Sequence, residues 1–456
     1  MLTPLEWLER LSRRLSMRAG AIRRFEDYYA GRHPMPAVQP EAQREFWRLL
    51  QQATTNWMGL VVDATAERLR VTGFRFGDDP SGDQDAWQLW QAQNLDAASE
   101  LAHTTACVAG EAYALVWADP GTDDGLKITV EHPATTIVEF DPSDHRVRRA
   151  ALKAWADDGV DYAIVYLPDS VHWYERQGNG PWQGRSVGPN PLGVVPVVPL
   201  VNRPQLMPYE GRSEIADVTA IQDRINATIF NRLLAAEFTA FRQRWVTGIE
   251  IPTDPETGAP VEPFKHAVNR LWISEDPETK FGEFGETGLG PYIGAVEADV
   301  QHIAAITRTP PHYLLGQSGA FPSGESLKST ETGLVAKVKR RQQHFGEAWE
   351  EVIRLAFAVV GDPRSKAEDA ETLWADPESR TEGEHVDALL KLSSLGVPQQ
   401  QLWEDAGYSP QQIARFRTMS AEDSLRVLLT QPRTTATPQS AEVVPPVEPS
   451  SPFLGG

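Results

Sequence analysis

Two apolar stripes at helical spacing, separated by a short strand-rich segment, constrain the fold of this chain more than any other feature of its sequence. The first lies on a helix predicted over residues 213–241 and consists of Val218, Ile221, Ile225 and Ile229. The second lies on a helix that begins at Pro291 and ends before Pro310, and it consists of Ile293, Val296, Val300, Ile303 and Ile306. At ~1.5 Å per residue the first helix is roughly 40 Å long. The sequence therefore predicts a pair of helical struts.

The segment between the struts, residues 244–290, carries turn signals and short runs of strand-forming residues. The runs WVTGIEIP and NRLWISED flank these turns, which predicts a small strand-rich cap. From residue 250 to residue 299 there are 11 acidic residues against Lys265, Arg270 and Lys280, a local net charge of −8. Such acidity is compatible with a merely solvated surface as well as with a docking surface.

Capping signals and periodicity predict three helices at the start of the chain. The run Thr3-Pro4-Leu5-Glu6 is a capping box with proline at the first helical position. A stripe of leucines follows it, and this helix should end near Gly31. The second helix is predicted over residues 41–69 and the third within residues 84–108.

After Gly110 the spacing of apolar residues changes from helical to strand-like. Six runs rich in strand-forming residues follow, separated by turn signals such as DPGTDDG and QGNGPWQG. Consecutive strands joined by short turns form an antiparallel meander. Residues 1–212 are therefore expected to form an α+β domain, in which helices precede an antiparallel sheet.

Residues 309–324 form a loop between the second strut and a long helix predicted over residues 325–361. From Gly319 the letters GAFPSGES match the phosphate-binding loop pattern, except that Glu325 stands where that loop has its lysine. A carboxylate there would repel the phosphates, and no buried strand precedes the loop, so nucleotide binding is rejected. The simpler interpretation is a loop whose Ser323 caps the next helix.

Four basic residues lie close together on the long helix: Lys337, Lys339, Arg340 and Arg341. A solvated or ion-paired helix face accounts for such a cluster, and contact with phosphate is the alternative. Short helical patterns then continue over residues 380–430. The last stretch, residues 431–456, is rich in proline, serine and threonine and is expected to be disordered.

Composition excludes several classes of function. The 456 residues carry a net charge of −20, so tight binding of nucleic acid through bulk charge is not expected. The single cysteine, Cys107, forms no internal disulfide, and the ten histidines lack metal-ligand spacing. Gly184 to Gly188 have the spacing of a nucleophile elbow, but the prolines that follow prevent the required helix. No run of about 18 apolar residues predicts a membrane span. We therefore expect a non-enzymatic protein without cofactor or metal, made in a reducing cytoplasm.

Three segments, in this order, resemble the portal proteins of tailed bacteriophages, particularly siphophages of actinobacterial hosts. They are RFEDYYAGRHP, the block from NRPQLMPYEGRSE to AFRQRW, and TRTPPHYLLGQSGAFPSGESLKSTETGL. The resemblance implies a dodecameric ring at one capsid vertex around a DNA channel. Matched segment by segment, it implies the following parts: a wing over residues 1–212, stem helices over 213–243 and 291–308, a clip over 244–290, a tunnel loop over 309–324, a helix from channel wall to wing over 325–361, and a helical crown over 362–430.

The resemblance also implies functional residues and partners. The tunnel loop would face double-stranded DNA through Gln317, Ser318, Phe321 and Ser323, and the cluster from Lys337 to Arg341 would contact DNA or a neighbouring subunit. The clip would dock the large terminase subunit and later the head-completion proteins, through Trp245, Glu250, Trp272 and Glu275. The major capsid protein and the scaffold are further implied partners.

The implied role is packaging, retention and ejection of the genome in the virion. Because the tunnel loop holds no cation, it could touch DNA without gripping it. Neighbouring copies in the ring would cover the apolar stripes of the two struts. Another phage head or connector protein, or a DNA-processing enzyme, are the alternatives.

Overall fold

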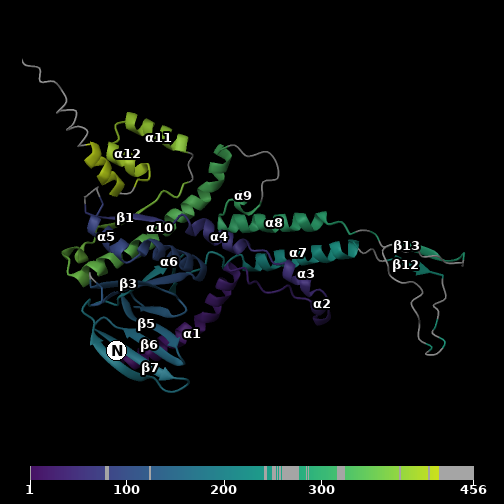
Figure 1. Ribbon diagram of the computed structural model, residues 1–456, viewed down its shortest axis with the longest axis horizontal. Helices are drawn as coiled ribbons and strands as arrows, with labels where there is room; N and C mark the ends of the chain where they lie inside the picture. Colours follow the sequence, from purple (N-terminus) through teal and green to yellow (C-terminus); the bar gives the residue numbers. More distant parts are fainter. Residues whose placement is uncertain are drawn as a thin grey trace, which may run out of the picture.

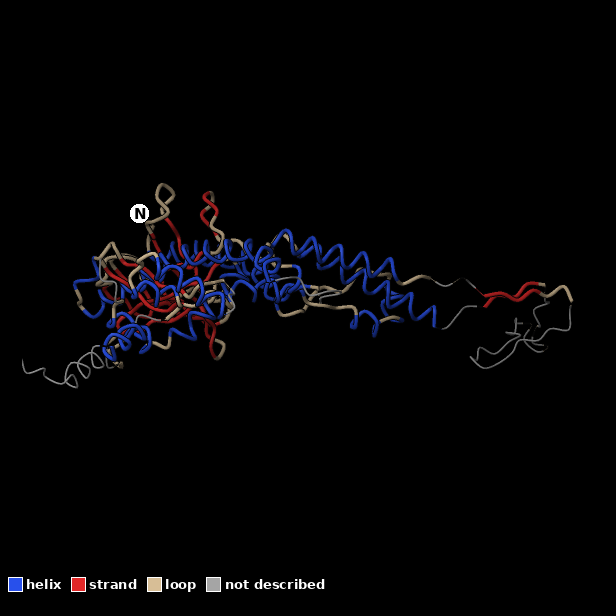
Figure 2. Tube along the Cα trace, turned by 90° about the horizontal axis from the view of Figure 1, so that it is seen from above, coloured by secondary structure: helices blue, strands red, loops and turns tan. Residues whose placement is uncertain are grey.

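The computed structural model describes residues 2–77, 82–122, 125–240, 244–248, 253, 255, 258, 277–283, 285, 287–315, 324–378, 382–408 and 411–420. A body of helices and sheets carries a pair of long helices that project from one side (Figures 1 and 2). A two-stranded sheet lies beyond the far end of that pair (Figure 1). The combination of helices with antiparallel sheets confirms the predicted α+β class.

The first helix, α1 (Pro4–Tyr29), begins at the predicted capping box. The hydroxyl of Thr3 accepts a hydrogen bond from the backbone N–H of Glu6 at 3.3 Å, and the Glu6 carboxylate accepts one from the Thr3 backbone N–H at 2.6 Å. Two backbone donors that the helix cannot satisfy are thereby paired. The prediction of this helix is confirmed at both ends.

The prediction of one helix over residues 41–69 is wrong, because tertiary contacts divide it. Three short helices occupy the range: α2 (Pro40–Glu45), α3 (Trp47–Gln52) and α4 (Trp57–Ala66). The Asn56 side chain caps α4, and the backbone N–H of Thr55 donates to Asn226 on a distant helix at 3.2 Å. Residues 84–108 likewise form two helices, α5 (Gln84–Ala92) and α6 (Leu95–Ala109), separated where Asn94 adopts a left-handed φ of 53°.

The predicted meander forms two antiparallel sheets. One has the order β3-β2-β9 and is built from β2 (Glu111–Ala118), β3 (Leu126–Glu131) and β9 (Val197–Val201). The other contains five consecutive strands: β4 (Thr136–Phe140), β5 (Arg148–Asp157), β6 (Val160–Tyr166), β7 (Ser170–Gln177) and β8 (Gln183–Pro189). Every pairing in both sheets is antiparallel, as short turns between consecutive strands require.

Alternate residues of β5 serve two different cores. Ala150 and Leu152 pack against the N-terminal half of α1, whereas Ala151 belongs to a cluster with residues of β2 and β9. Side chains of successive strand residues point to opposite faces, so one strand can contribute to both. The five-stranded sheet therefore lies between α1 and the three-stranded sheet.

The largest core surrounds the long helix α10 (Gly324–Val360), which packs against α6 and both β2 and β9. Phe345, Trp349 and Phe357 of α10 are completely buried there, or nearly so. Trp349 meets Trp90 edge-on, with ring centroids 5.0 Å apart. Large aromatic side chains bury the most apolar surface per residue, so α10 is the central element of the body.

After α10 the chain returns to the body instead of entering a helical region at once. A short 3-10 helix, η1 (Pro363–Lys366), is followed by strand β14 (Ala370–Trp374), which pairs antiparallel with β1 (Val71–Phe76). The expectation of a purely helical segment from residue 362 is therefore wrong up to residue 374, because the partner strand lies about 300 positions earlier. Helices follow as predicted: α11 (Glu382–Ser394), α12 (Gln399–Asp405) and a helical stretch over 411–420. Residues 431–456, predicted to be disordered, lie outside the described part.

His103 lies at the centre of the core around α10. Its Nδ1 is 3.0 Å from the backbone oxygen of Leu69, and its Nε2 accepts a hydrogen bond from the indole N–H of Trp349 at 2.8 Å. This arrangement requires the neutral imidazole, with the proton on Nδ1. Complete burial disfavours the charged form and lowers the pKa of His103 to about 3.

Lowering the pH from 6.5 to 5 is expected to reduce the free energy of unfolding through His103. Over this range the unfolded chain takes up a proton at the imidazole and the folded chain does not. The unfolded imidazole is half protonated at pH 6.5, so the loss is roughly 1.6 kcal/mol, below the limit of about 1.4 kcal/mol per pH unit, and urea denaturation at the two pH values measures it. His103→Gln keeps an acceptor for Trp349 without a titrating group, so its loss should be smaller by that amount. Equal losses in both proteins would contradict the prediction.

Candidate functional site

The predicted struts are α7 (Thr219–Ala240) and α8 (Gly290–Thr307), which run antiparallel side by side away from the body (Figure 1). Arg224 of α7 donates two hydrogen bonds to Asp299 of α8, at 2.8 and 2.5 Å. These bonds hold the pKa of Asp299 below its ordinary value. The first strut begins six residues later than predicted, because residues 214–218 form turns and the backbone N–H of Glu214 donates to Cys107 in the body.

The chain itself covers the larger part of the two apolar stripes. Ile225, Ile229, Val300 and Ile303 are at most 5% exposed and belong to the main core. The expectation that neighbouring copies cover these positions is therefore wrong: α3 and α4 pack against α7, and α9 (Pro311–Leu314) packs against α8. Large apolar side chains remain exposed at Ile293, Ile306 and Phe238, which are 45–50% exposed.

A buried polar network fixes the base of α7 to the body, and the sequence analysis missed it. Gln222 and Asn226 are fully buried. Gln222 donates to the backbone oxygen of Thr55 at 2.8 Å, and the Asn226 amide lies 3.1 Å from Nδ1 of His33. Two amides four residues apart, beside the stripe residues Ile221 and Ile225, were the only sequence signal. Because amide positions are fixed by hydrogen bonds, the network determines where the strut leaves the body.

The cap contains a two-stranded antiparallel sheet of β12 (Arg244–Thr247) and β13 (Lys280–Glu283) beyond the far end of the struts (Figure 1). Trp245 is 39% exposed and lies across its partner Gly282, where any Cβ would collide with the indole. The other predicted clip residues, Glu250, Trp272 and Glu275, lie outside the described residues. So do the predicted loop residues Gln317, Ser318, Phe321 and Ser323.

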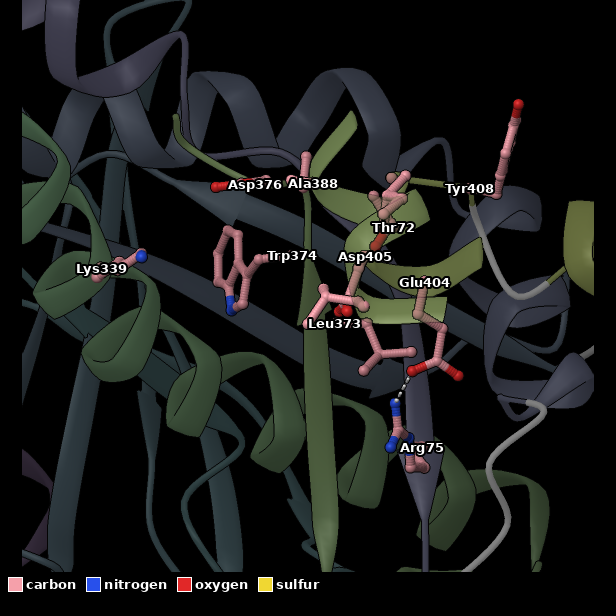
Figure 3. Close-up of a pocket in the computed structure, with 14 residues that line it drawn as sticks. Thr72, Arg75, Lys339, Leu373, Trp374, Asp376, Ala388, Glu404, Asp405 and Tyr408 are labelled. Carbon is pink, nitrogen blue, oxygen red and sulfur yellow. Dashed lines mark hydrogen bonds and ion pairs between the residues drawn. The ribbon is translucent and has the colours of Figure 1, made fainter. Parts of the chain in front are cut away.

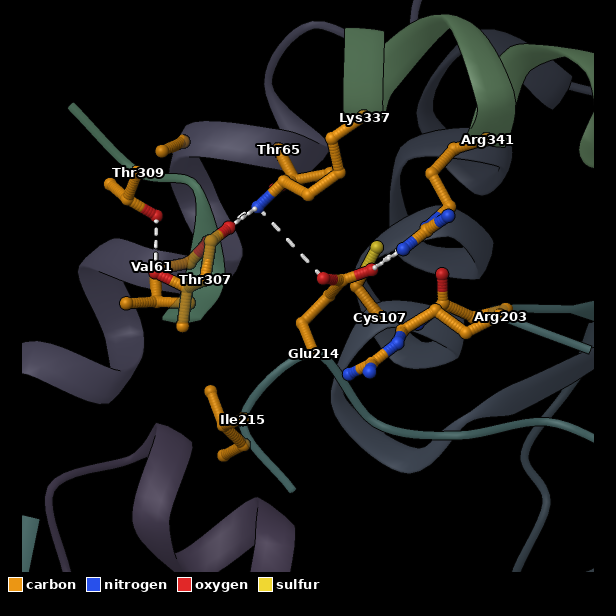
Figure 4. Close-up of polar contacts among 12 residues, drawn as sticks. Val61, Thr65, Cys107, Arg203, Glu214, Ile215, Thr307, Thr309, Lys337 and Arg341 are labelled. Carbon is orange, nitrogen blue, oxygen red and sulfur yellow. Dashed lines mark hydrogen bonds and ion pairs between the residues drawn. The ribbon is translucent and has the colours of Figure 1, made fainter. Parts of the chain in front are cut away.

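A buried ion-pair cluster lies where the struts join the body, and it consists of Glu214, Lys337 and Arg341 (Figure 4). Two Arg341 nitrogens lie 2.8 and 2.7 Å from one Glu214 oxygen, and Lys337 Nζ lies 3.9 Å from the other. Lys337 also donates to the backbone oxygen of Thr307 at 2.9 Å. All three side chains are at least nine-tenths buried. Burial alone would raise the pKa of Glu214, but the two cations outweigh it and the pKa is lowered.

This geometry separates the four basic residues of α10. Lys337 and Arg341 are buried and paired with Glu214, which matches the alternative of an ion-paired helix face for these two residues. Lys339 is exposed and lies 3.6 Å from Glu378. Arg340 is exposed and lines a cavity beside the cluster.

A second cavity, of about 450 Å³, lies between the β1-β14 sheet and the C-terminal helices α11 and α12 (Figure 3). Arg75 of β1 lies 3.4 Å from Glu404 of α12. Lys339 and Trp374 line the same space. The ion pair therefore connects the C-terminal helices to the body.

The described residues hold no group of three or more His, Cys, Asp or Glu side chains able to bind a metal ion. Cys107 is completely buried, and burial raises the pKa of its thiol, which disfavours the reactive thiolate. Within the same part of the chain, no helix is both long and apolar enough to cross a bilayer.

Comparison with known proteins identifies the family. Residues 8–424 match the family model described as phage portal protein, SPP1 Gp6-like. The chain is 32% identical to the portal protein of Mycobacterium phage L5 and 32% identical to that of Mycobacterium phage D29. Each alignment extends over 452 residues, 93% of this chain and 92% of the relative.

Among solved structures, the chain resembles the neck of a native GTA particle computed with C12 symmetry. The TM-score is 0.44 at 10% identity, over 81% of this chain and 93% of that one. The family model and the two relatives extend over both the body and the struts, and both relatives come from mycobacteriophages. They confirm the resemblance noted in the sequence: the chain belongs to the SPP1 Gp6-like family of phage portal proteins.

Proposed function

We propose that this portal protein assembles into a closed, dodecameric ring at one capsid vertex and forms the channel through which DNA is packaged, retained and ejected. The observation that carries the proposal is the family match over residues 8–424, which includes the body, both struts and the cap. The projecting pair α7 and α8 supports it, because an elongated subunit can line a channel along its length (Figure 2).

The architecture supports the following assignment of parts to the ring subunit. The body up to residue 212, together with β14, forms the wing; α7 and α8 form the stem; and the segment containing β12 and β13 forms the clip. The C-terminal helices from α11 onward form the crown, connected to the wing by Arg75 and Glu404. The loop before α10 is the tunnel loop, with Gln317, Ser318, Phe321 and Ser323 facing DNA.

The clip is the docking surface for partners. Its acidity and the exposed Trp245 suit a protein partner better than nucleic acid. We assign this surface, with Glu250, Trp272 and Glu275, to the large terminase subunit during packaging and to head-completion proteins afterwards. Scaffold and major capsid protein contact the ring during assembly in the host cytoplasm, before the protein becomes part of the virion. The protein itself has no enzymatic role, and ATP hydrolysis belongs to the terminase.

Purified full-length protein is expected to form closed rings with a central hole in negative-stain images. Ile293 of α8 is 45% exposed, and we expect a neighbouring copy to cover it in the ring. Ile293→Glu should therefore reduce the fraction of closed rings several-fold, because a buried unpaired carboxylate is strongly unfavourable. The fraction of particles in rings, counted at one protein concentration, measures the effect.

Gln301→Glu is the matched control, since it adds the same charge at an exposed polar position of the same helix. It should form rings as well as the unmodified protein does. Compact single copies of the unmodified protein at high concentration would refute the proposal. Magnesium-dependent cleavage of DNA by those copies would favour a DNA-processing enzyme, and open filaments or other assemblies would favour a different head or connector protein.

A further inference from the structure

A small basic cavity lies where α8 ends, beside α10 and the turns that precede α7. Its volume is about 210 Å³. Five cationic side chains line it, against the two carboxylates of Glu214 and Asp217: Arg203, Arg308, Lys337, Arg340 and Arg341. The lining thus carries an excess of three positive charges in a chain whose net charge is −20. Charge of that sign, concentrated in a small cavity, attracts anions.

Both carboxylates are already engaged within the chain. Glu214 accepts from Arg341 and lies near Lys337, as in the ion-pair cluster. One oxygen of Asp217 accepts from Arg203 at 2.9 Å, and the other accepts from Arg212. Both acids are therefore already paired with cations other than Arg308 and Arg340.

Arg308 and Arg340 are the cavity cations whose side chains have no partner among the described residues. Both are exposed at the cavity, and neither guanidinium forms a hydrogen bond or an ion pair with a described residue. Arg308 ends α8 with a left-handed φ of 55°, and Arg203 has a φ of 50°. Such backbone conformations are rare for residues other than glycine, asparagine and aspartate, and they are found disproportionately at functional sites.

We infer that this cavity binds the oxygens of a phosphate group, with Arg308 and Arg340 as direct donors. The planar guanidinium presents paired N–H groups that match phosphate oxygens. Lys337 and Arg341 lie behind them, nine-tenths buried, where charge is weakly screened and strengthens the field at the mouth. A cavity of about 210 Å³ has room for a phosphate group.

The phosphate can come from the backbone of channel DNA or from free phosphate. The position of the cavity favours DNA. Arg308 lies directly before the proposed tunnel loop, and α10, which carries Arg340, begins directly after it. This choice of source rests on the proposed function. Binding of inorganic phosphate by the unassembled chain does not depend on ring formation, so failure of the two proposals can be distinguished.

The test compares the double variant Arg308→Gln with Arg340→Gln against a control double variant, Arg44→Gln with Arg146→Gln. The control removes the same charge from arginines that are at least 80% exposed. Calorimetric titration of the full-length chain with inorganic phosphate should show binding that falls about tenfold or more in the test variant and stays unchanged in the control. Both variants should keep the unmodified unfolding midpoint.

Titration with a short DNA duplex identifies the source. If DNA is the ligand, the slope of log affinity against log salt should decrease by about 2 in the test variant and not in the control. A decrease confined to inorganic phosphate would support the site with free phosphate as its ligand. Absence of phosphate binding, or equal binding by both variants, would overturn the inference. The inference would also be overturned if the test variant lost the ability to form rings but bound phosphate as before. In that case the two arginines would pair with carboxylates of a neighbouring copy.

Discussion

Glu214→Gln is expected to lower the free energy of unfolding by about 3–5 kcal/mol. The substitution keeps the shape of the side chain and removes the only carboxylate that contacts both Lys337 and Arg341 among the described residues. The side chains of these cations are 6% exposed, so water cannot replace the lost anion. An uncompensated buried charge is far more costly than a missing surface ion pair. Urea denaturation at one fixed protein concentration measures the loss, because ring formation would otherwise contribute.

Two further variants show whether charge is the cause. Asp387→Asn breaks an ion pair with Lys391 whose side chains are 63% and 74% exposed, and it should cost under about 0.5 kcal/mol. Glu214→Leu combined with Lys337→Met and Arg341→Met removes all three charges and should recover much of the stability that Glu214→Gln loses. A triple variant as unstable as the single one would show that packing, and not charge, dominates this position.

Trp349→Ala is expected to destabilise the body by a similar amount, about 3–5 kcal/mol. Trp349 is completely buried, meets Trp90 edge-on and donates its indole N–H to His103. Removing the indole leaves a cavity in the largest core and an unpaired nitrogen on His103. The urea concentration at the unfolding midpoint should therefore fall, while the ion-pair cluster of Glu214, Lys337 and Arg341 stays intact in the folded protein.

Trp349→Phe separates the two contributions. Phenylalanine keeps most of the ring volume but has no N–H, so its cost should be about 1–3 kcal/mol from the unpaired His103 nitrogen and the smaller ring. Trp155→Ala is the control, because that indole is 39% exposed on β5, where it stacks on Tyr162 and lies under the ammonium of Lys153. A loss for Trp155→Ala as large as for Trp349→Ala would contradict the assignment of α10 as the central element.

Local signals in the sequence predicted individual elements well. The capping box at Thr3 predicted the start of α1, and strand-forming runs between turn signals predicted the antiparallel meander. These signals involve residues within about four positions of one another, where hydrogen bonds and side-chain periodicity act directly. The same reasoning failed at residues 41–69. The helical spacing of apolar residues continues through this range, but the chain forms three separate helices there, and contacts with α7 divide them.

The candidate site shows the same limit. The sequence revealed the basic residues of α10 but not Glu214, which lies more than 120 positions before them and buries two of the four. It revealed the stripes on α7 and α8 but not the helices of the same chain that cover them. Arg308, whose side chain has no partner in the described part of the chain, lies outside the basic cluster that the sequence revealed.

The sequence by itself determined the order of the parts, the α+β class and the portal family, because local periodicity, turn chemistry and a long ordered resemblance are all written along the chain. Only the tertiary structure decided which charges are buried, which stripes are covered and that β14 returns to β1. Those outcomes depend on contacts between different elements of the chain, many of them more than 100 positions apart. Chain closure and packing govern the formation of such contacts, and no local pattern specifies them.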